Sequence, residues 1–205
     1  MAVSSFSVSR VGSRSQLISC RSCTPLKILN PQSAGDTCHV VLSSFGGGFV
    51  DGDRVGLEID CGADSVLYLE TQANTRVYET PGEHVALQRV TGRLQTGALA
   101  VVAADPLVPH RRSRFEQYQE WHLDAGACLV LYDWLTSGRS DNGEHHQYDR
   151  IDSEIRIHVD GRPLIIDRYR FEPGVREPSI TGCFGGYHHL LNIYFVGDLL
   201  LPLSP

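Results

Sequence analysis

Turn-forming dipeptides recur at short intervals along almost the whole chain, and they restrict its fold more than any other feature. They include Asp51-Gly52, Pro81-Gly82, Asn142-Gly143, Asp160-Gly161 and Pro173-Gly174. Runs of strand length with β-branched or alternating residues lie between the turns, at residues 39–43, 54–59, 65–70, 84–94, 115–123, 128–134 and 151–159. Short strands at this spacing predict a mainly β protein, an antiparallel sandwich or barrel-like fold. No long amphipathic stripe appears, so at most two short helices are expected, one of them within residues 71–79.

Two segments predict individual hairpins. Residues 6–10 and 15–20 alternate on either side of Gly12. The first 35 residues contain no acid and many Ser and Arg, which is also the composition of an organelle transit peptide, but the alternation favours two strands. The clearest hairpin covers residues 153–167, where Asp160-Gly161 can supply the two left-handed residues of a tight turn.

Length and composition exclude several kinds of protein. A chain of 205 residues fits one domain, and without a clear linker residues 1–205 are expected to form a single unit. The formal net charge of −6 argues against nucleic-acid binding. The longest apolar runs are too short to span a bilayer and no secretory signal is present, so we expect a cytoplasmic protein without membrane insertion.

The run Gly46-Gly47-Gly48, followed by Asp51-Gly52-Asp53, is the most informative local feature. Glycine lacks a Cβ, so this run permits positive φ and close approach of the backbone to other groups. Asp51 and Asp53 stand two residues apart, so an extended segment would place both carboxylates on one side, where they could bind a divalent cation. A solvated turn with aspartate as turn former is an interpretation of equal weight.

Two further carboxylates are candidates for a functional role. Asp133 lies inside the apolar run 129–135, so it is predicted to be at least half buried and to need a partner, for which Arg139 is the obvious candidate. Glu172 ends the charged segment 167–172, which indicates either an exposed strand face or a carboxylate lining the same polar region as Asp53.

Possible nitrogen and sulfur ligands are scattered. The doublets His145-His146 and His188-His189 can each give one imidazole to a given site, because adjacent strand residues point to opposite faces. Cys20 and Cys23 form half of a soft-metal site without a second pair, and six cysteines are too sparse for a disulfide scaffold. The chain has no GxxxxGK[ST], GxGxxG, HExxH or GxSxG motif, so it is predicted not to be an enzyme.

Several segments together resemble the urease accessory protein D family (UreD/UreH). The resemblance rests on residues 46–54 (GGGFVDGDR), 71–78 (TQANTRVY), 105–109 (DPLVP), 132–135 (YDWL), 167–171 (DRYRF), 185–187 (GGY) and 192–197 (NIYFVG). The matching motifs keep one order from near residue 10 to near residue 197. The glycine-aspartate motif and the segment that begins with Thr71 and Gln72 are the most specific of them.

The resemblance implies an all-β scaffold whose many strands stack in a helical arrangement, with two helices. It implies a non-catalytic chaperone of urease maturation that docks on urease apoprotein with accessory proteins F and G, the GTPase G carrying nickel. No cofactor would be bound tightly, because nickel is an ion in transit through a polar tunnel whose oxygen ligands release it readily. By motif, the resemblance assigns the tunnel lining to Asp53, Thr71, Gln72, Asp133 and Glu172, transient nickel binding to Asp53 and Glu172, and a structural role to Gly46, Gly47, Gly48, Gly52 and Arg139.

The chain departs from the family in two places. Family members continue for tens of residues beyond residues 200–205, so the C-terminal end is expected to be incomplete. His145-His146 also stands where the family tends to have an aromatic residue. Two alternatives remain: a metal-dependent enzyme using Asp51, Asp53 and a histidine of a doublet, and a metal-free β interaction module.

Overall fold

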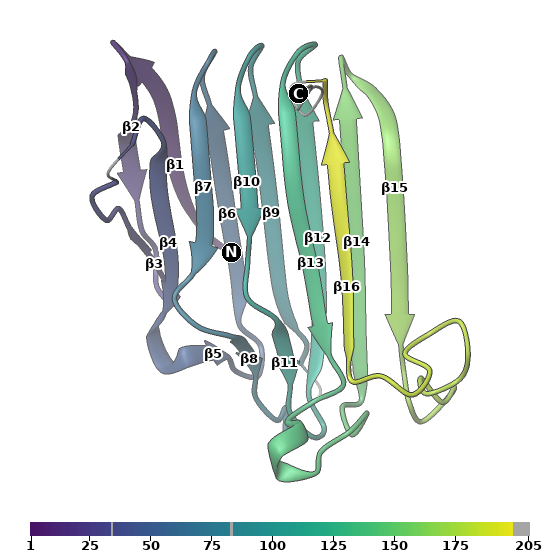
Figure 1. Ribbon diagram of the computed structural model, residues 1–205. Coiled ribbons are helices and arrows are strands. Elements are labelled where there is room, and N and C mark those ends of the chain that lie inside the picture. The colour runs from purple at the N-terminus through teal and green to yellow at the C-terminus, as the bar shows by residue number, and fades with distance from the viewer. Residues whose placement is uncertain (34, 83, 199–205) are drawn as a thin grey trace.

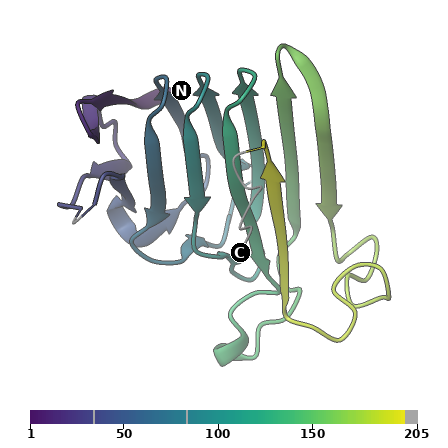
Figure 2. The same cartoon turned by 45° about the horizontal axis from the view of Figure 1, so that its top comes forward.

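The computed structural model describes residues 1–33, 35–82 and 84–198, and strands dominate them. Two sheets face each other along the length of the molecule (Figure 1), and Figure 2 shows the chain passing from one to the other in successive coils. The C-terminal end was expected to be incomplete, and residues 199–205, where that prediction falls, lie outside the described residues.

Sixteen strands make up the two sheets in the described residues. They are β1 (Ala2–Val11), β2 (Arg14–Arg21), β3 (Leu26–Leu29), β4 (Cys38–Ser44), β5 (Gly48–Phe49), β6 (Arg54–Cys61), β7 (Val66–Thr71), β8 (Thr75–Val77), β9 (Ala86–Leu94), β10 (Leu99–Ala103), β11 (Leu107–Pro109), β12 (Arg114–Leu123), β13 (Cys128–Thr136), β14 (Arg150–Val159), β15 (Arg162–Phe171) and β16 (His189–Val196). The first sheet has the order β15-β14-β12-β9-β6-β1-β2. The second has the order β3-β4-β7-β10-β13-β11-β8-β5, and β16 pairs with β13.

Most neighbouring strands are parallel, so the predicted antiparallel sandwich is wrong. In the first sheet β1, β6, β9, β12 and β14 run parallel, and in the second β4, β7, β10 and β13 do so. Each coil adds one strand to each sheet and repeats about every 30 residues, as in solenoid proteins. This is the helical stacking of strands that the family resemblance implies. Turn residues mark the corner of a coil as well as the reversal of a hairpin, so the turn pattern could not separate the two arrangements.

Both predicted hairpins are confirmed. Strands β1 and β2 pair antiparallel about Gly12, whose φ is 61°. Strands β14 and β15 pair antiparallel about Asp160 and Gly161, with φ of 48° and 70°. Local turn chemistry therefore decided these two connections.

The helix predicted within residues 71–79 is wrong. Strand β7 ends at Thr71, and β8 then pairs in parallel with both β5 and β11. The backbone groups of β8 therefore form hydrogen bonds within the sheet and not within a helix. In the described residues helical structure is limited to two three-residue 3-10 segments, η1 (Phe45–Gly47) and η2 (Ser140–Asn142). Neither has the length or apolarity needed to cross a membrane.

The hydrophobic core fills the space between the two sheets. Alternate residues of each central strand point inward, such as Leu67 and Leu69 in β7 and Ile155 and Ile157 in β14. The largest fully buried side chain, Trp121, packs on Gly92, where a Cβ atom would lie 2.1 Å from the ring. Apolar side chains thus fill most of the space between the sheets, and a single row of polar side chains interrupts them.

Candidate functional site

The two most specific motifs of the sequence pack against each other. Gly46 and Gly47 have φ of 81° and 74°, and a Cβ on Gly48 would lie 2.2 Å from the carbonyl oxygen of Arg76. The Tyr78 hydroxyl donates a hydrogen bond of 2.8 Å to the Gly46 carbonyl. The positive φ and the close backbone approach that the glycine run was predicted to permit are therefore confirmed.

The aspartates that follow the glycine run form a turn. Asp53 Oδ2 accepts a hydrogen bond of 2.9 Å from the Val50 N–H, and Gly52 supplies a φ of 77° between them. Asp51 Oδ2 accepts the Gly82 N–H at 3.2 Å. The histidine near Asp51 is His84, 3.8 Å from Nδ1 to Oδ2, and belongs to neither doublet. Asp53 lines neither of the two cavities described next.

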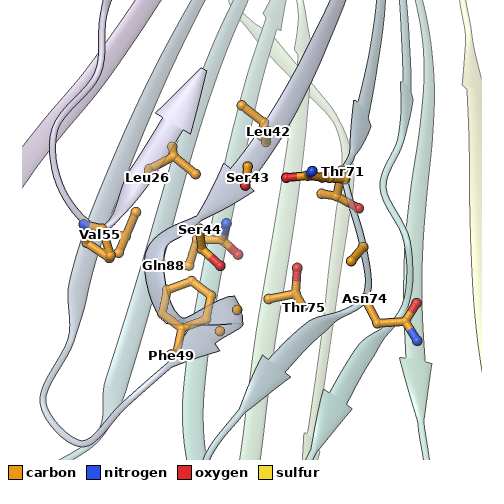
Figure 3. Close-up of a pocket in the computed structure, with 15 residues that line it drawn as sticks. Leu26, Leu42, Ser43, Ser44, Phe49, Val55, Thr71, Asn74, Thr75 and Gln88 are labelled. Carbon is orange, nitrogen blue, oxygen red and sulfur yellow. The ribbon is translucent and has the colours of Figure 1, made fainter. Parts of the chain in front are cut away.

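A cavity of about 150 Å³ opens beside this glycine motif. It lies between β3, β4, β8 and the first sheet, and Figure 3 shows hydroxyl and amide side chains around it next to Leu26 and Phe49. Its polar lining residues are Ser43, Ser44, Thr71, Gln72, Asn74, Thr75 and Gln88. Thr71 and Gln72, two of the predicted passage residues, therefore lie together here.

A second cavity of about 80 Å³ continues from the first into the interior. The two share the lining residues Leu42, Thr71, Thr75 and Gln88, so they adjoin. Thr71 Oγ1 donates a hydrogen bond of 3.0 Å to Asp105 Oδ2 and accepts one of 2.9 Å from the Asp105 N–H. Asp133 and Gln117 also line this second cavity.

Strand register extends the polar lining into a row that crosses the sandwich. In the first sheet Gln88, Gln117, Ser153 and Tyr169 are successive neighbours on β9, β12, β14 and β15. In the second sheet Asp133 is directly opposite Asn192 on β16. The Gln117 amide joins the two sides, donating to Asp133 Oδ1 at 3.1 Å and to Ser153 Oγ at 3.3 Å.

Asp133 is the most deeply buried carboxylate of this row, with 6% of its surface exposed. Removal from water raises the pKa of Asp133 above its usual range, while nearby Tyr169, Gln117 and Asn192 favour the ionised form. Tyr169 and Asn192 stand close to Asp133, yet no hydrogen bond of ordinary geometry reaches its Oδ2 from the described residues. The predicted burial is confirmed.

The predicted pair between Asp133 and Arg139 is wrong. Arg139 instead binds Glu144 with two hydrogen bonds, Nε to Oε2 at 2.9 Å and Nη2 to Oε1. Arg139 lies beyond the end of β13, on the loop that contains η2, whereas the Asp133 side chain faces the interior. Glu172 follows β15, where its carbonyl accepts the Val175 and Arg176 N–H groups, and its side chain lines neither cavity.

The nitrogen and sulfur side chains lie elsewhere. His145 and His188, one from each doublet, stack with ring centroids 4.2 Å apart, and both Nδ1 atoms approach Ser137 Oγ. Cys20 and Cys23 are free thiols at the edge of the first sheet. Over the described ranges, no three His, Cys, Asp or Glu side chains come together as a metal site.

Sequence reasoning missed Asp105, Gln88 and Gln117 as parts of the site. Asp105 was recognised only as the first residue of the motif at residues 105–109. Gln88 and Gln117 are single polar residues in otherwise ordinary strands, and only the register places them side by side. A polar residue recurring at the coil period is the signal that could have found them.

The sequence model described as UreD urease accessory protein matches residues 2–204 of this chain. The chain belongs to the UreD family. Among its relatives, UreD of Cytophaga hutchinsonii is 37% identical over 191 residues, which cover 93% of this chain and 67% of that protein. UreD of Sorangium cellulosum is 40% identical over 164 residues, covering 80% and 52%, and urease accessory protein D of Arabidopsis thaliana is 34% identical over 177 residues, covering 84% and 60%. The chain thus spans about half to two thirds of these UreD relatives.

Proposed function

We propose that this protein acts as a scaffold in urease maturation and passes nickel toward the urease active site along the polar row between its two sheets. Its partners would be urease apoprotein and the urease accessory proteins F and G. Membership of the UreD family supports the link to urease. The observation that carries the passage is the pair of adjoining cavities that leads from the glycine motif to the buried Asp133.

The chemistry of the row suits an ion in transit. Its polar groups are hydroxyls, amides and carboxylates that lie among apolar side chains, and cysteine and histidine are absent from the lining residues of both cavities. Oxygen ligands hold nickel more weakly than thiolate or imidazole, so the ion can leave again. A cation also compensates the Asp133 carboxylate, whose ionised form is otherwise unfavourable in this setting.

The proposed passage uses Thr71, Gln72 and Asp133, with Asp105 and Gln117 as additional oxygen donors. Asp53 and Glu172 line neither cavity, and their proposed transient binding of nickel needs separate variants to test it. The protein would make or break no covalent bond. Its contribution is to hold the partners and provide the route.

The test is urease activation in cells that co-express the chain with urease and the other accessory proteins. We expect Asp133→Asn to reduce the nickel content and activity of purified urease at least about fivefold while the chain still co-purifies with its partners. The control is Asp141→Asn, an exposed carboxylate on η2 that lines neither cavity. Full nickel loading with Asp133→Asn would refute the passage, and failure of the wild-type chain to co-purify with urease would refute the scaffold.

A further inference from the structure

One imidazole from each histidine doublet meets the other beside the end of β13. The rings of His145 and His188, which are far apart in the chain, stack with centroids 4.2 Å apart and planes 25° from parallel. The other two members of the doublets, His146 and His189, instead pack against other aromatic rings, at 4.7 Å and 5.9 Å between centroids. Each doublet therefore supplies one ring to the pair and one ring to packing.

Ser137, directly after β13, holds the two chain segments in place. Its N–H donates a hydrogen bond of 2.8 Å to the His188 carbonyl, and its carbonyl accepts one of 2.6 Å from the His146 N–H. His146 has a φ of 52°, a left-handed conformation that is uncommon outside glycine and often marks a functional site. The side chains of His145 and His188 are exposed, whereas Ser137 is completely buried. The two rings thus face solvent from a fixed base.

The two rings direct the same nitrogen atom toward one oxygen. Nδ1 of His145 lies 3.3 Å from Ser137 Oγ, and Nδ1 of His188 lies 3.4 Å from it. A hydroxyl oxygen has two lone pairs, so it can accept an N–H from both rings at once. That tautomer leaves both Nε2 atoms unprotonated and able to bind a metal ion. A hydrogen bond from the other ring nitrogen is the usual way in which a protein orients a histidine ligand.

We propose that His145 and His188 together bind one divalent transition-metal ion through their Nε2 atoms, with Ser137 orienting both rings. Two nitrogens at about 2.0–2.1 Å from one ion lie roughly 3 Å apart, so a small rotation of the stacked, exposed rings is sufficient. Neutral imidazole suits zinc, nickel and copper(II). Two protein ligands are fewer than a structural zinc centre has, so water completes the coordination and the ion can exchange.

This site is separate from the polar row between the sheets. His145 lies on the loop after η2 and His188 directly precedes β16, and no histidine lines either cavity. The proposal therefore does not depend on the nickel passage, and either can fail without the other. Packing alone does not account for the stack, because exposed rings bury little apolar surface and lose side-chain freedom when they are held together.

The test is isothermal titration of the metal-free full chain with Zn²⁺, after alkylation of its accessible thiols. Wild type should bind an ion whose affinity falls at least about tenfold in His145→Ala and in His188→Ala, because each variant removes one of two ligands. The matched control is His189→Ala, which removes an exposed imidazole of the same doublet and should change the affinity less than about twofold.

Combining the two substitutions separates one shared site from two independent ones. In a shared site, the double variant should lose far less than the sum of the two single losses. As a second measurement, Zn²⁺ should protect His145 and His188, but not His189, from diethyl pyrocarbonate, with mass spectrometry locating the modified rings. No ion bound by wild type, equal weakening in the His189→Ala control, additive losses in the double variant, or equal modification with and without Zn²⁺ would overturn the proposal.

Discussion

Two aspartates lie on strands of different sheets, one side chain facing outward and the other facing the interior, and their surroundings differ sharply. Asp152 on β14 is 2% exposed on the outer side of the first sheet, where Arg170 Nε reaches Oδ2 at 2.6 Å and Arg168 Nε lies 3.5 Å from Oδ1. Asp133 on β13 is 6% exposed between the sheets. It accepts one hydrogen bond from Gln117 and forms no ion pair with any described residue.

Strands β14 and β15 of the first sheet supply both environments. On β15, Arg168 and Arg170 point outward to Asp152, while Tyr169 between them approaches Asp133. On β14, Asp152 faces outward and Ser153 inward. Strand alternation thus gives one carboxylate permanent cations and the other only neutral dipoles. A buried carboxylate without a cation is costly, so the interior one is the carboxylate suited to bind a passing cation.

The largest effect should follow from making Asp152 resemble Asp133. Replacing both Arg168 and Arg170 with Ala leaves the buried Asp152 carboxylate without either cation, so the free energy of unfolding should fall by clearly more than in the control below. Urea denaturation measures the loss. The control is Arg162→Ala on the same strand, an exposed residue expected to change stability by less than about 0.5 kcal/mol. A loss no larger than that of the control would mean that Asp152 does not depend on its arginines.

A smaller effect of opposite sign is expected from neutralising the interior carboxylate. Burial raises the pKa of Asp133, so the folded state binds its proton more tightly than the unfolded chain does. Ionisation therefore removes stability as pH rises above the usual range of an aspartate. Asp133→Asn should stabilise the metal-free protein by about 1 kcal/mol at neutral pH, and the gain should disappear toward pH 4.

Thermal unfolding across this pH range, with Asp152→Asn alongside, sharpens the comparison. Asp152→Asn weakens the pairs with two arginines and should destabilise the protein at neutral pH. If Asp133→Asn also destabilises at neutral pH, the interior carboxylate is a structural anchor, and its lack of a cation has no functional meaning.

Sequence alone could predict what local chemistry decides. The turns at Gly12 and at Asp160-Gly161, the burial of Asp133 and the positive φ of the glycine run all follow from residues close together in the chain. The parallel coil does not, because coil corners and hairpins use the same turn residues. The pairing of Asp133 with Arg139 failed because an extended chain advances about 3.3 Å per residue and carries Arg139 far beyond hydrogen-bond reach.

The polar row could not be predicted from local sequence either, because it also depends on how the strands pair. Gln88, Gln117 and Ser153 are distant in sequence and become neighbours only through parallel register. A one-residue shift in that register would turn each of them to the other face of the sheet. The motif resemblance identified Thr71, Gln72 and Asp133 as lining residues, but it did not identify the residues opposite them in the first sheet.

The third and smallest prediction extends the comparison to a carboxylate near solvent. Glu144 binds Arg139, whose side chain is 38% exposed, and this hydrogen-bonded cation lowers the pKa of Glu144. The pair should therefore stabilise the fold above the usual pKa of a glutamate and lose its effect as pH falls below it. Because solvent screens the pair, Arg139→Ala should cost only about 0.5 kcal/mol in urea denaturation at neutral pH and still less in 1 M salt.

Arg139→Lys separates charge from geometry in this pair. Lysine keeps the charge but loses the bidentate contact to Glu144, so it should recover only part of the stability lost in Arg139→Ala. A cost above about 2 kcal/mol for Arg139→Ala would place this pair alongside that of Asp152. The solvent exposure of a pair would then not determine how much it stabilises this protein. The difference between Asp152 and Asp133 would in that case depend only on the presence of arginines beside Asp152.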